Sequence, residues 1–186
     1  RLERVTHHIN HGHNQYAPMP GVPELRAAVT QKIADCYKIA IDSNDEITIT
    51  SGATEALFSA IQAFVGIDDE VIVFDPAYDS YEPAVTLAGG KTIHVPLLAS
   101  NFAIDWNRFS DALSDKTKLI ILNSPHNPSG AVISQEDLDT LATLITDKPI
   151  LILSDEVYEH IIFDGETPVS YTHLRAHETL MNLVCR

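Results

Sequence analysis

The chain has few of the residues on which several classes of protein depend. Its two cysteines in 186 residues exclude a disulfide framework and suit a reducing compartment. Only 12 basic residues oppose 26 acidic ones, and the net charge of −14 argues against nucleic acid or an anionic membrane as a partner. No apolar run approaches the roughly 20 residues of a membrane-spanning helix, and lysine is absent after Lys148. We therefore expect an acidic globular protein of the cytoplasm.

Helical periodicity and short apolar runs alternate along most of the chain. We expect helices at residues 23–38, 54–64, 81–88, 105–113 and 134–145, and strands at residues 46–50, 70–74, 92–95, 118–122 and 150–153. The runs Leu119–Leu122 and Ile150–Leu153 are apolar on both faces, which is typical of parallel strands covered by helices on both sides. The pattern predicts an α/β fold with a mainly parallel sheet.

The first polar candidates, Ser51-Gly52-Ala53-Thr54, lie between an expected strand and the helix that follows it. The N–H groups of a first helical turn and the helix dipole favour an anion such as phosphate there. Gly52 lets the backbone approach that anion closely, and Ser51 or Thr54 offers a hydroxyl donor. An ordinary turn with a Ser or Thr cap explains the same four residues.

A second group follows two of the expected strands. Asp155 lies just beyond strand 150–153, where its carboxylate could accept a charge-assisted hydrogen bond from a protonated pyridine nitrogen. Tyr158, and Asn127 in the proline-rich loop after strand 118–122, could reach the 3-oxygen of the same ring. Each has an ordinary alternative, because an acidic pair or an Asn-Pro-Ser-Gly stretch also forms caps and turns.

Several further residues are weaker evidence for a functional site when each is considered alone. Tyr78 follows strand 70–74, where it could stack on an aromatic ring or simply pack. Tyr16 alone indicates a loop before a helix, and we expect Cys36 in a helix core rather than as a nucleophile. Four histidines near the start lie in an expected loop with no carboxylate partner, so no metal site is assigned to them: His7, His8, His11 and His13.

Taken together, the motifs resemble the fold-type I pyridoxal-phosphate aminotransferases of class I/II over roughly residues 8–168. Five stretches occur in the family's order: Asn-Gln-Tyr-Ala-Pro-Met-Pro-Gly-Val-Pro-Glu-Leu-Arg at 14–26, Thr-Ser-Gly-Ala-Thr-Glu-Ala at 50–56, Asp-Pro-Ala-Tyr-Asp-Ser-Tyr at 75–81, Asn-Ser-Pro-His-Asn-Pro-Ser-Gly at 123–130 and Ser-Asp-Glu-Val-Tyr-Glu-His at 154–160. The combination looks closest to the bacterial methionine aminotransferase branch, near kynurenine aminotransferase. The resemblance implies a three-layer α/β/α large domain.

The resemblance also implies a set of residues that bind pyridoxal 5′-phosphate: Tyr16, Gly52, Ala53, Thr54, Tyr78, Asn127, Asp155 and Tyr158. Tyr16 would reach the cofactor phosphate of a neighbouring subunit, which makes the functional unit a homodimer. Asp155 would bind the ring nitrogen, and Asn127 would also help hold the substrate carboxylate.

The implied reaction moves an amino group from an amino acid to a 2-oxo acid, and methionine-, aromatic- or glutamine-like donors are expected. Two alternatives stay open. A cysteine-conjugate β-lyase uses the same scaffold and the same motifs. A transcription regulator could instead carry an aminotransferase-like sensor domain behind a DNA-binding module, although no residue of this chain points to one.

The chain departs from the family where the cofactor should be held covalently. The family's Schiff-base lysine follows the Asp-x-x-Tyr motif, and neither Lys148 nor Arg175 is placed to take a missing role. We therefore assign no catalytic residue and expect a truncated chain that is inactive alone. Its expected parts are an N-terminal loop segment, a partial cofactor-binding domain, and a non-native tail whose pattern continues no element: residues 1–22, 23–168 and 169–186.

Overall fold

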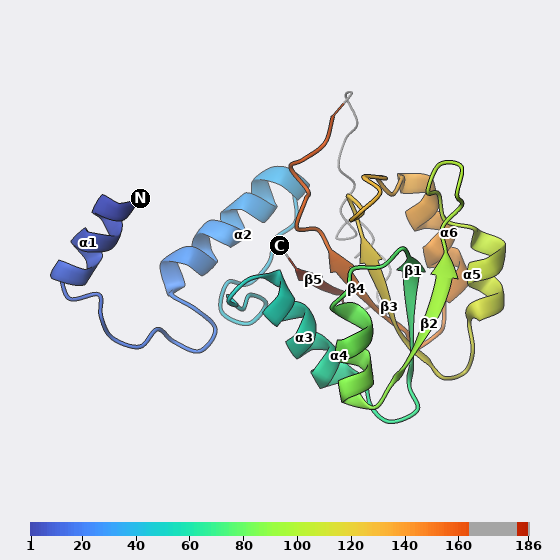
Figure 1. Cartoon of the computed structure of the whole chain (residues 1–186). Helices are drawn as coiled ribbons and strands as arrows, with labels where there is room; N and C mark the ends of the chain where they lie inside the picture. The colour runs from blue at the N-terminus through green and yellow to red at the C-terminus, as the bar shows by residue number, and fades with distance from the viewer. Residues whose placement is uncertain (164–181, 186) are drawn as a thin grey trace. The chain divides into compact units, whose positions relative to one another are not determined.

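The computed structural model describes residues 1–163 and 182–185 and divides the chain into two compact units (Figure 1). The first unit comprises residues 1–50 and the second residues 51–186. Within the described residues, no helix is both long and apolar enough to cross a membrane.

The first unit contains two helices, α1 (Leu2–Asn10) and α2 (Pro23–Tyr37). Helix α1 corrects the expectation that residues 1–22 are all loop; its apolar residues Leu2, Val5 and Ile9 recur at helical spacing among polar neighbours. Its histidines are close together, with the rings of His7 and His11 stacked at a centroid distance of 3.9 Å.

Helix α2 begins at Pro23 as expected, and its buried face includes an arginine beside Ile33 and Tyr37. Arg26 is buried and donates through Nη1 to the Ser43 carbonyl at 2.8 Å, whereas Leu25 is 45% exposed. Cys36 is exposed, so its expected place in a helix core was wrong. The buried face of the helix consists of Arg26, Ile33 and Tyr37. Because adjacent residues on a helix point about 100° apart, the side chain of Cys36 points away from this face.

The strand expected at residues 46–50 does not form. Ile47 is buried and the Ile49 N–H donates to the Pro20 carbonyl at 2.9 Å, but the segment is not part of the described sheet. A β-rich run becomes a strand only where a neighbouring strand supplies a ladder of hydrogen bonds, and sequence alone does not show that neighbour.

The second unit is built on a five-stranded parallel sheet with the strand order β2-β1-β3-β4-β5 (Figure 1). The strands are β1 (Glu70–Asp75), β2 (Lys91–Pro96), β3 (Thr117–Asn123), β4 (Leu151–Asp155) and β5 (Asn182–Cys185). The helices are α3 (Ala53–Phe64), α4 (Tyr81–Ala88), α5 (Trp106–Ala112) and α6 (Gln135–Ile145). These bounds lie within one or two residues of every element expected between residues 54 and 153.

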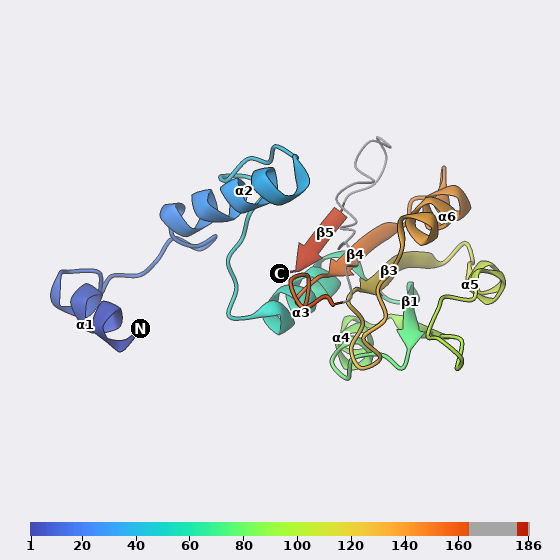
Figure 2. The same cartoon turned by 90° about the horizontal axis from the view of Figure 1, so that it is seen from above.

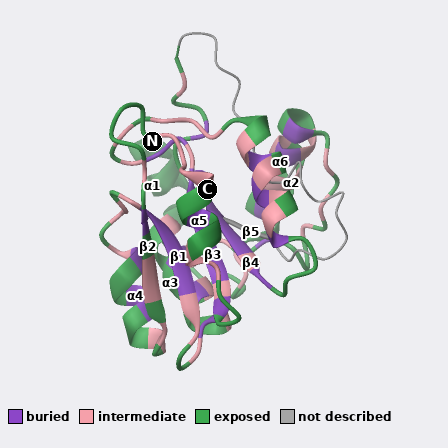
Figure 3. Ribbon diagram, turned by 90° about the vertical axis from the view of Figure 1, so that its right-hand side faces the viewer, coloured by how far each residue is buried: buried purple, intermediate pink, exposed green. Residues whose placement is uncertain are grey.

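Two hydrophobic clusters cover the two faces of the sheet. Helices α3 and α4 pack on one face with Val71, Val73 and Ile121, and helices α5 and α6 pack on the other face with Ile72 and Ile120 (Figure 2). Neighbouring residues of one strand therefore enter opposite clusters, and the central strands β3 and β4 are buried except at Lys118 and Leu151, which are partly exposed (Figure 3). The predicted α/β fold with a parallel sheet is confirmed.

Strand β5 lies in the segment for which we expected no element. It pairs in parallel with β4, with Asp155 opposite Cys185. The origin of residues 169–186 stays a prediction, and residues 169–181 and 186 of that segment lie outside the described part of the chain.

Helix α6 begins with a capping box. The Ser134 side chain accepts from the Asp137 N–H at 3.1 Å, and the Asp137 carboxylate accepts from the Ser134 N–H at 3.1 Å. Asp137 also accepts from the Trp106 indole N–H at 3.0 Å, which joins α6 to the start of α5. This one cap therefore orients two helices on the same face of the sheet.

Ser134→Ala should lower the free energy of unfolding by about 1 kcal/mol, because the Asp137 N–H loses its acceptor and water replaces it incompletely. Urea unfolding followed by circular dichroism measures the change. Ser100→Ala is the matched control, since Ser100 is exposed and caps no helix. Equal stability of both variants and the wild type would show that the capping box contributes nothing.

Candidate functional site

A cavity of about 210 Å³ opens at the carboxyl ends of β3 and β4. The N-terminus of α3, the loops after β1 and β3, and the segment after β4 form its walls: Ala53, Thr54, Leu57, Tyr78, Asn123, Asn127, Asp155, Val157 and Tyr158. Ligands of open parallel sheets bind at this edge, because the loops that enter the following helices meet there. Six of the eight residues predicted from the sequence line this one cavity.

Asp155 is the last residue of β4 and is 4% exposed. One carboxylate oxygen accepts from the Tyr81 hydroxyl at 2.6 Å, and the other accepts from the Val157 N–H at 3.3 Å. Within the described residues no basic side chain forms an ion pair with it. Burial raises the pKa of Asp155 above its ordinary value, although the hydrogen bonds from Tyr81 and Val157 oppose this rise.

The opposite wall is the N-terminus of α3. Gly52 is its N-cap residue, with φ +89°, a conformation that glycine adopts without strain. As a glycine, the N-cap residue has no side chain with which to cap the helix, and the Glu55 carboxylate accepts a hydrogen bond from the Ser51 N–H. Ala53 and Thr54 begin the helix and face the cavity, so the positive end of the helix dipole points to it.

Asn123, the last residue of β3, connects the other walls. Its side-chain nitrogen donates to the Asp155 carbonyl at 3.1 Å, and its side-chain oxygen accepts from the Asn127 N–H at 2.7 Å. The ring of Tyr78 lies edge-on to that of Tyr81, with centroids 5.6 Å apart. Asn127, Asp155 and Tyr78 are thus held around one space by hydrogen bonds and ring contacts.

The other predicted residues differ in their position relative to the cavity. Tyr158 lines the cavity and is 36% exposed. Gly52 adjoins the cavity as the residue before Ala53 without lining it. Tyr16 belongs to the other unit and is fully exposed, so its predicted role at a neighbouring subunit's cofactor stays a prediction.

Sequence reasoning missed Tyr81 and Asn123, both of which are buried and contact Asp155. Both residues could have been found from the sequence. Tyr81 lies three residues after the predicted Tyr78, and Asn123 ends an apolar strand as Asp155 does. The arrangement offers a helix N-terminus for an anion, an aromatic ring for stacking, and a buried carboxylate for a cationic ring nitrogen.

Comparison with known proteins points to one family. The model of the family "Aminotransferase class I and II" matches residues 2–185. The chain is 50% identical over 164 residues to a methionine aminotransferase of Escherichia coli, covering 88% of this chain and 42% of the relative. It is 36% identical over 161 residues to a probable kynurenine–oxoglutarate transaminase of Saccharomyces cerevisiae, covering 81% of this chain and 36% of the relative.

A solved structure of an Escherichia coli protein with a methionine aminotransferase function superposes with a TM-score of 0.93 at 45% identity. The match covers 99% of this chain and 49% of that one. The chain thus spans about half the length of the relatives it matches. Because the family match extends over nearly every residue, the chain belongs to the class I and II aminotransferases, a family that depends on pyridoxal 5′-phosphate.

Proposed function

We propose that this chain supplies the cofactor-binding wall of an aminotransferase that moves an amino group from an amino acid to a 2-oxo acid. The observation that carries the proposal is the pairing, across one cavity, of a buried carboxylate with a helix N-terminus. Methionine-, aromatic- and glutamine-like donors, a homodimer and a cytoplasmic location are parts of the same proposal. The relatives named methionine and kynurenine aminotransferase support the choice of donors.

The residues of the cavity fit pyridoxal 5′-phosphate in their chemistry. The cofactor has a phosphate at one end and a pyridine nitrogen on the ring, and the cavity has the N-terminus of α3 on one wall and Asp155 on the other. A buried carboxylate without a cationic partner is unfavourable, and a protonated ring nitrogen would supply that partner. Asn127 and Tyr158 offer donors for the ring's 3-oxygen.

When bound, the cofactor supplies an electron sink for the carbanion that forms at the substrate's α-carbon. Asp155 strengthens this sink by keeping the ring nitrogen protonated, and Tyr81 holds the carboxylate in place through its hydroxyl. Tyr78, which lines the cavity, would stack on one face of the ring and shield that face from water. Asn127 orients the ring oxygen and contributes to binding the substrate carboxylate. Among the 186 residues, no lysine follows Lys148.

Asp155→Asn should lower the affinity for pyridoxamine 5′-phosphate about 30-fold or more, because a buried charge-assisted hydrogen bond is lost. This compound has no aldehyde, so it cannot react with surface lysines and reports the non-covalent site. Isothermal titration of the 186-residue chain measures the affinity. Wild-type and variant chains that bind equally well would contradict the proposal.

The same substitution should stabilise the empty chain at neutral pH, by about 1 kcal/mol, a typical effect of one substitution. Because burial raises the pKa of Asp155, the charged form costs stability above that pKa, and the cost vanishes as pH falls below the ordinary aspartate value. The advantage of Asp155→Asn over wild type should therefore shrink on acidification. Urea unfolding at a series of pH values tests this sign.

Tyr81→Phe removes the hydroxyl that lowers the pKa of Asp155, so the carboxylate should take up its proton at higher pH. The affinity for pyridoxamine 5′-phosphate should fall about tenfold at neutral pH. The loss of affinity on acidification should also begin at a higher pH than in the wild type; this is the acid limb of the plot of affinity against pH. Tyr78→Phe is the matched control for that limb, since Tyr78 makes no hydrogen bond to Asp155. An unchanged acid limb in Tyr81→Phe would contradict the assignment.

A further inference from the structure

Two of the groups proposed to hold the cofactor ring come from neighbouring strands of the sheet. Asp155 ends β4, and Asn127 lies in the loop after β3. The pyridine ring of the cofactor carries its nitrogen and its 3-oxygen on one edge, with a single ring carbon between the two positions. A carboxylate and an amide can bind both groups at once only if the protein fixes the spacing between them.

The side chain of Asn123 joins these two residues. Asn123 lies opposite Asp155 in the pairing of β3 with β4. Its side-chain nitrogen donates to the Asp155 carbonyl at 3.1 Å, and its side-chain oxygen accepts from the Asn127 N–H at 2.7 Å. Only one orientation of the amide satisfies both partners, because a carbonyl needs a donor and an N–H needs an acceptor. An aspartate would lack the donor, and a leucine would lack both groups.

The two partners depend on Asn123 to different degrees. The Asp155 carbonyl also accepts from the Ser124 N–H at 3.1 Å, and the Asp155 carboxylate is held by the Tyr81 hydroxyl. In the described part of the chain, the Asn127 N–H has no acceptor other than Asn123, and the Asn127 side chain has no partner. Loss of the Asn123 side chain should therefore displace Asn127 more than Asp155.

The loop that carries Asn127 is also closed by bonds of its own. The His126 N–H donates to the Ala131 carbonyl at 2.8 Å, and the Gly130 N–H donates to the His126 carbonyl at 2.7 Å. These bonds lie inside the loop, so they preserve its shape without connecting Asn127 to β4. The bond between Asn127 and Asn123 makes that connection.

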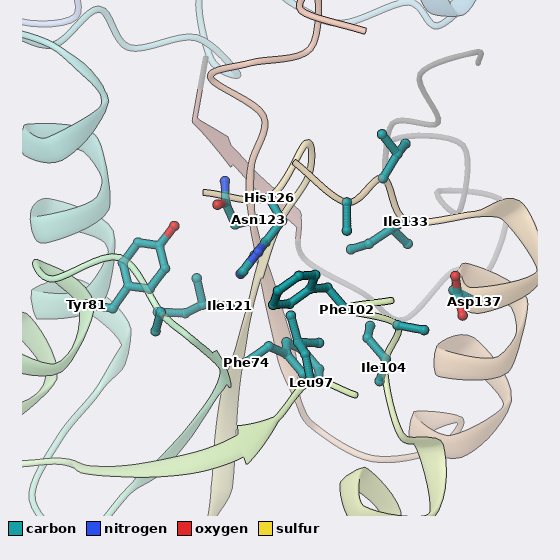
Figure 4. Close-up of a pocket in the computed structure, with 14 residues that line it drawn as sticks. Phe74, Tyr81, Leu97, Phe102, Ile104, Ile121, Asn123, His126, Ile133 and Asp137 are labelled. Carbon is teal, nitrogen blue, oxygen red and sulfur yellow. The ribbon is translucent and has the colours of Figure 1, made fainter. Parts of the chain in front are cut away.

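Asn123 separates two cavities as well. Its side chain is buried, and among the described residues that line either cavity it alone lines both the cofactor cavity and a smaller one of about 40 Å³. Figure 4 shows Asn123 at one end of the smaller cavity, whose walls include Phe74, Phe102 and Ile121. Mainly apolar walls offer a water molecule few partners, so water cannot easily replace the hydrogen bonds of Asn123.

We propose that Asn123 is a positioning residue that holds the Asn127 amide at a fixed spacing from the Asp155 carboxylate, so that the 3-oxygen and the nitrogen of one ring are bound together. The inference rests on the proposed function, because the spacing matters only if a ring binds there. Both ends of the Asn123 amide are bonded to the backbone, so Asn123 acts through Asn127 rather than on the ring itself.

The test compares two ligands that differ only in the 3-oxygen, pyridoxamine 5′-phosphate and its 3-deoxy analogue. Isothermal titration of the 186-residue chain gives the ratio of their affinities. The wild type should prefer pyridoxamine 5′-phosphate about tenfold, because Asn127 and Tyr158 donate to the oxygen. In Asn123→Leu, which keeps the size of the side chain, the ratio should fall to about threefold. A loss of stability alone would weaken both ligands equally and leave the ratio unchanged.

Two polar variants keep the test decisive if Asn123→Leu folds poorly. The carboxylate of Asn123→Asp can still accept from the Asn127 N–H, whereas the hydroxyl of Asn123→Ser lies one bond closer to the backbone and cannot reach it. The aspartate variant should therefore keep a ratio near that of the wild type, and the serine variant should not. Equal ratios in these two variants would overturn the proposal.

Thr117→Ala is the matched control, because Thr117 is a buried polar residue at the opposite end of the same strand. Its hydroxyl oxygen accepts from the Ser114 N–H at 2.9 Å, so the substitution removes one acceptor without touching the cavity. It should lower stability and leave the ratio of affinities unchanged. If Thr117→Ala lowers the ratio as much as Asn123→Leu, general loosening of β3 explains the result and the positioning role is wrong.

The two ligands also separate failure of this inference from failure of the proposed function. A wild-type chain that binds neither ligand overturns both together. Binding with a ratio that Asn123→Leu leaves unchanged overturns the inference only. A wild type that binds both ligands equally well has no donor at the 3-oxygen, which overturns the inference and leaves the pairing of Asp155 with the ring nitrogen intact.

Discussion

The buried carboxylate of Asp155 is the constraint on which the site depends. It ends the strand β4, is 4% exposed, and has two hydrogen-bond donors but no cationic partner in the described residues. Removing a carboxylate from water costs several kcal/mol unless a partner compensates, so a fold that keeps one buried at a cavity wall leaves part of that cost for a ligand to offset. A protonated pyridine ring is a partner of the right charge and shape.

The remaining parts of the site hold this carboxylate and the space beside it. Asn123 binds both the Asp155 carbonyl and the Asn127 N–H, and Tyr81 connects Asp155 to the helix α4 and to Tyr78. The first link runs between the neighbouring strands β3 and β4 and the second from helix α4 to β4. The apolar clusters on the two faces of the sheet fix the positions of these elements. The core therefore positions the site, and the stability lost by burying a charge is offset by packing elsewhere.

Much of this arrangement could be predicted from the sequence. Apolar runs such as Leu119–Leu122 indicated buried parallel strands, and polar residues directly after such runs, including Asp155, had to meet at one edge of the sheet. The partners of those residues could not be predicted, because the contact of Tyr81 with Asp155 joins positions 74 residues apart. The missing strand at 46–50 and the exposure of Cys36 depended likewise on which surfaces tertiary packing selects.

The central claim is that Asp155 keeps a bound pyridine ring protonated. Nitrogen-15 NMR of pyridoxamine 5′-phosphate, labelled in its ring and bound to the chain, measures this directly across pH. The account predicts that the ring nitrogen of the bound ligand keeps its proton well above the pH at which the free ligand loses it. A bound ring nitrogen that titrates as it does in water would contradict it.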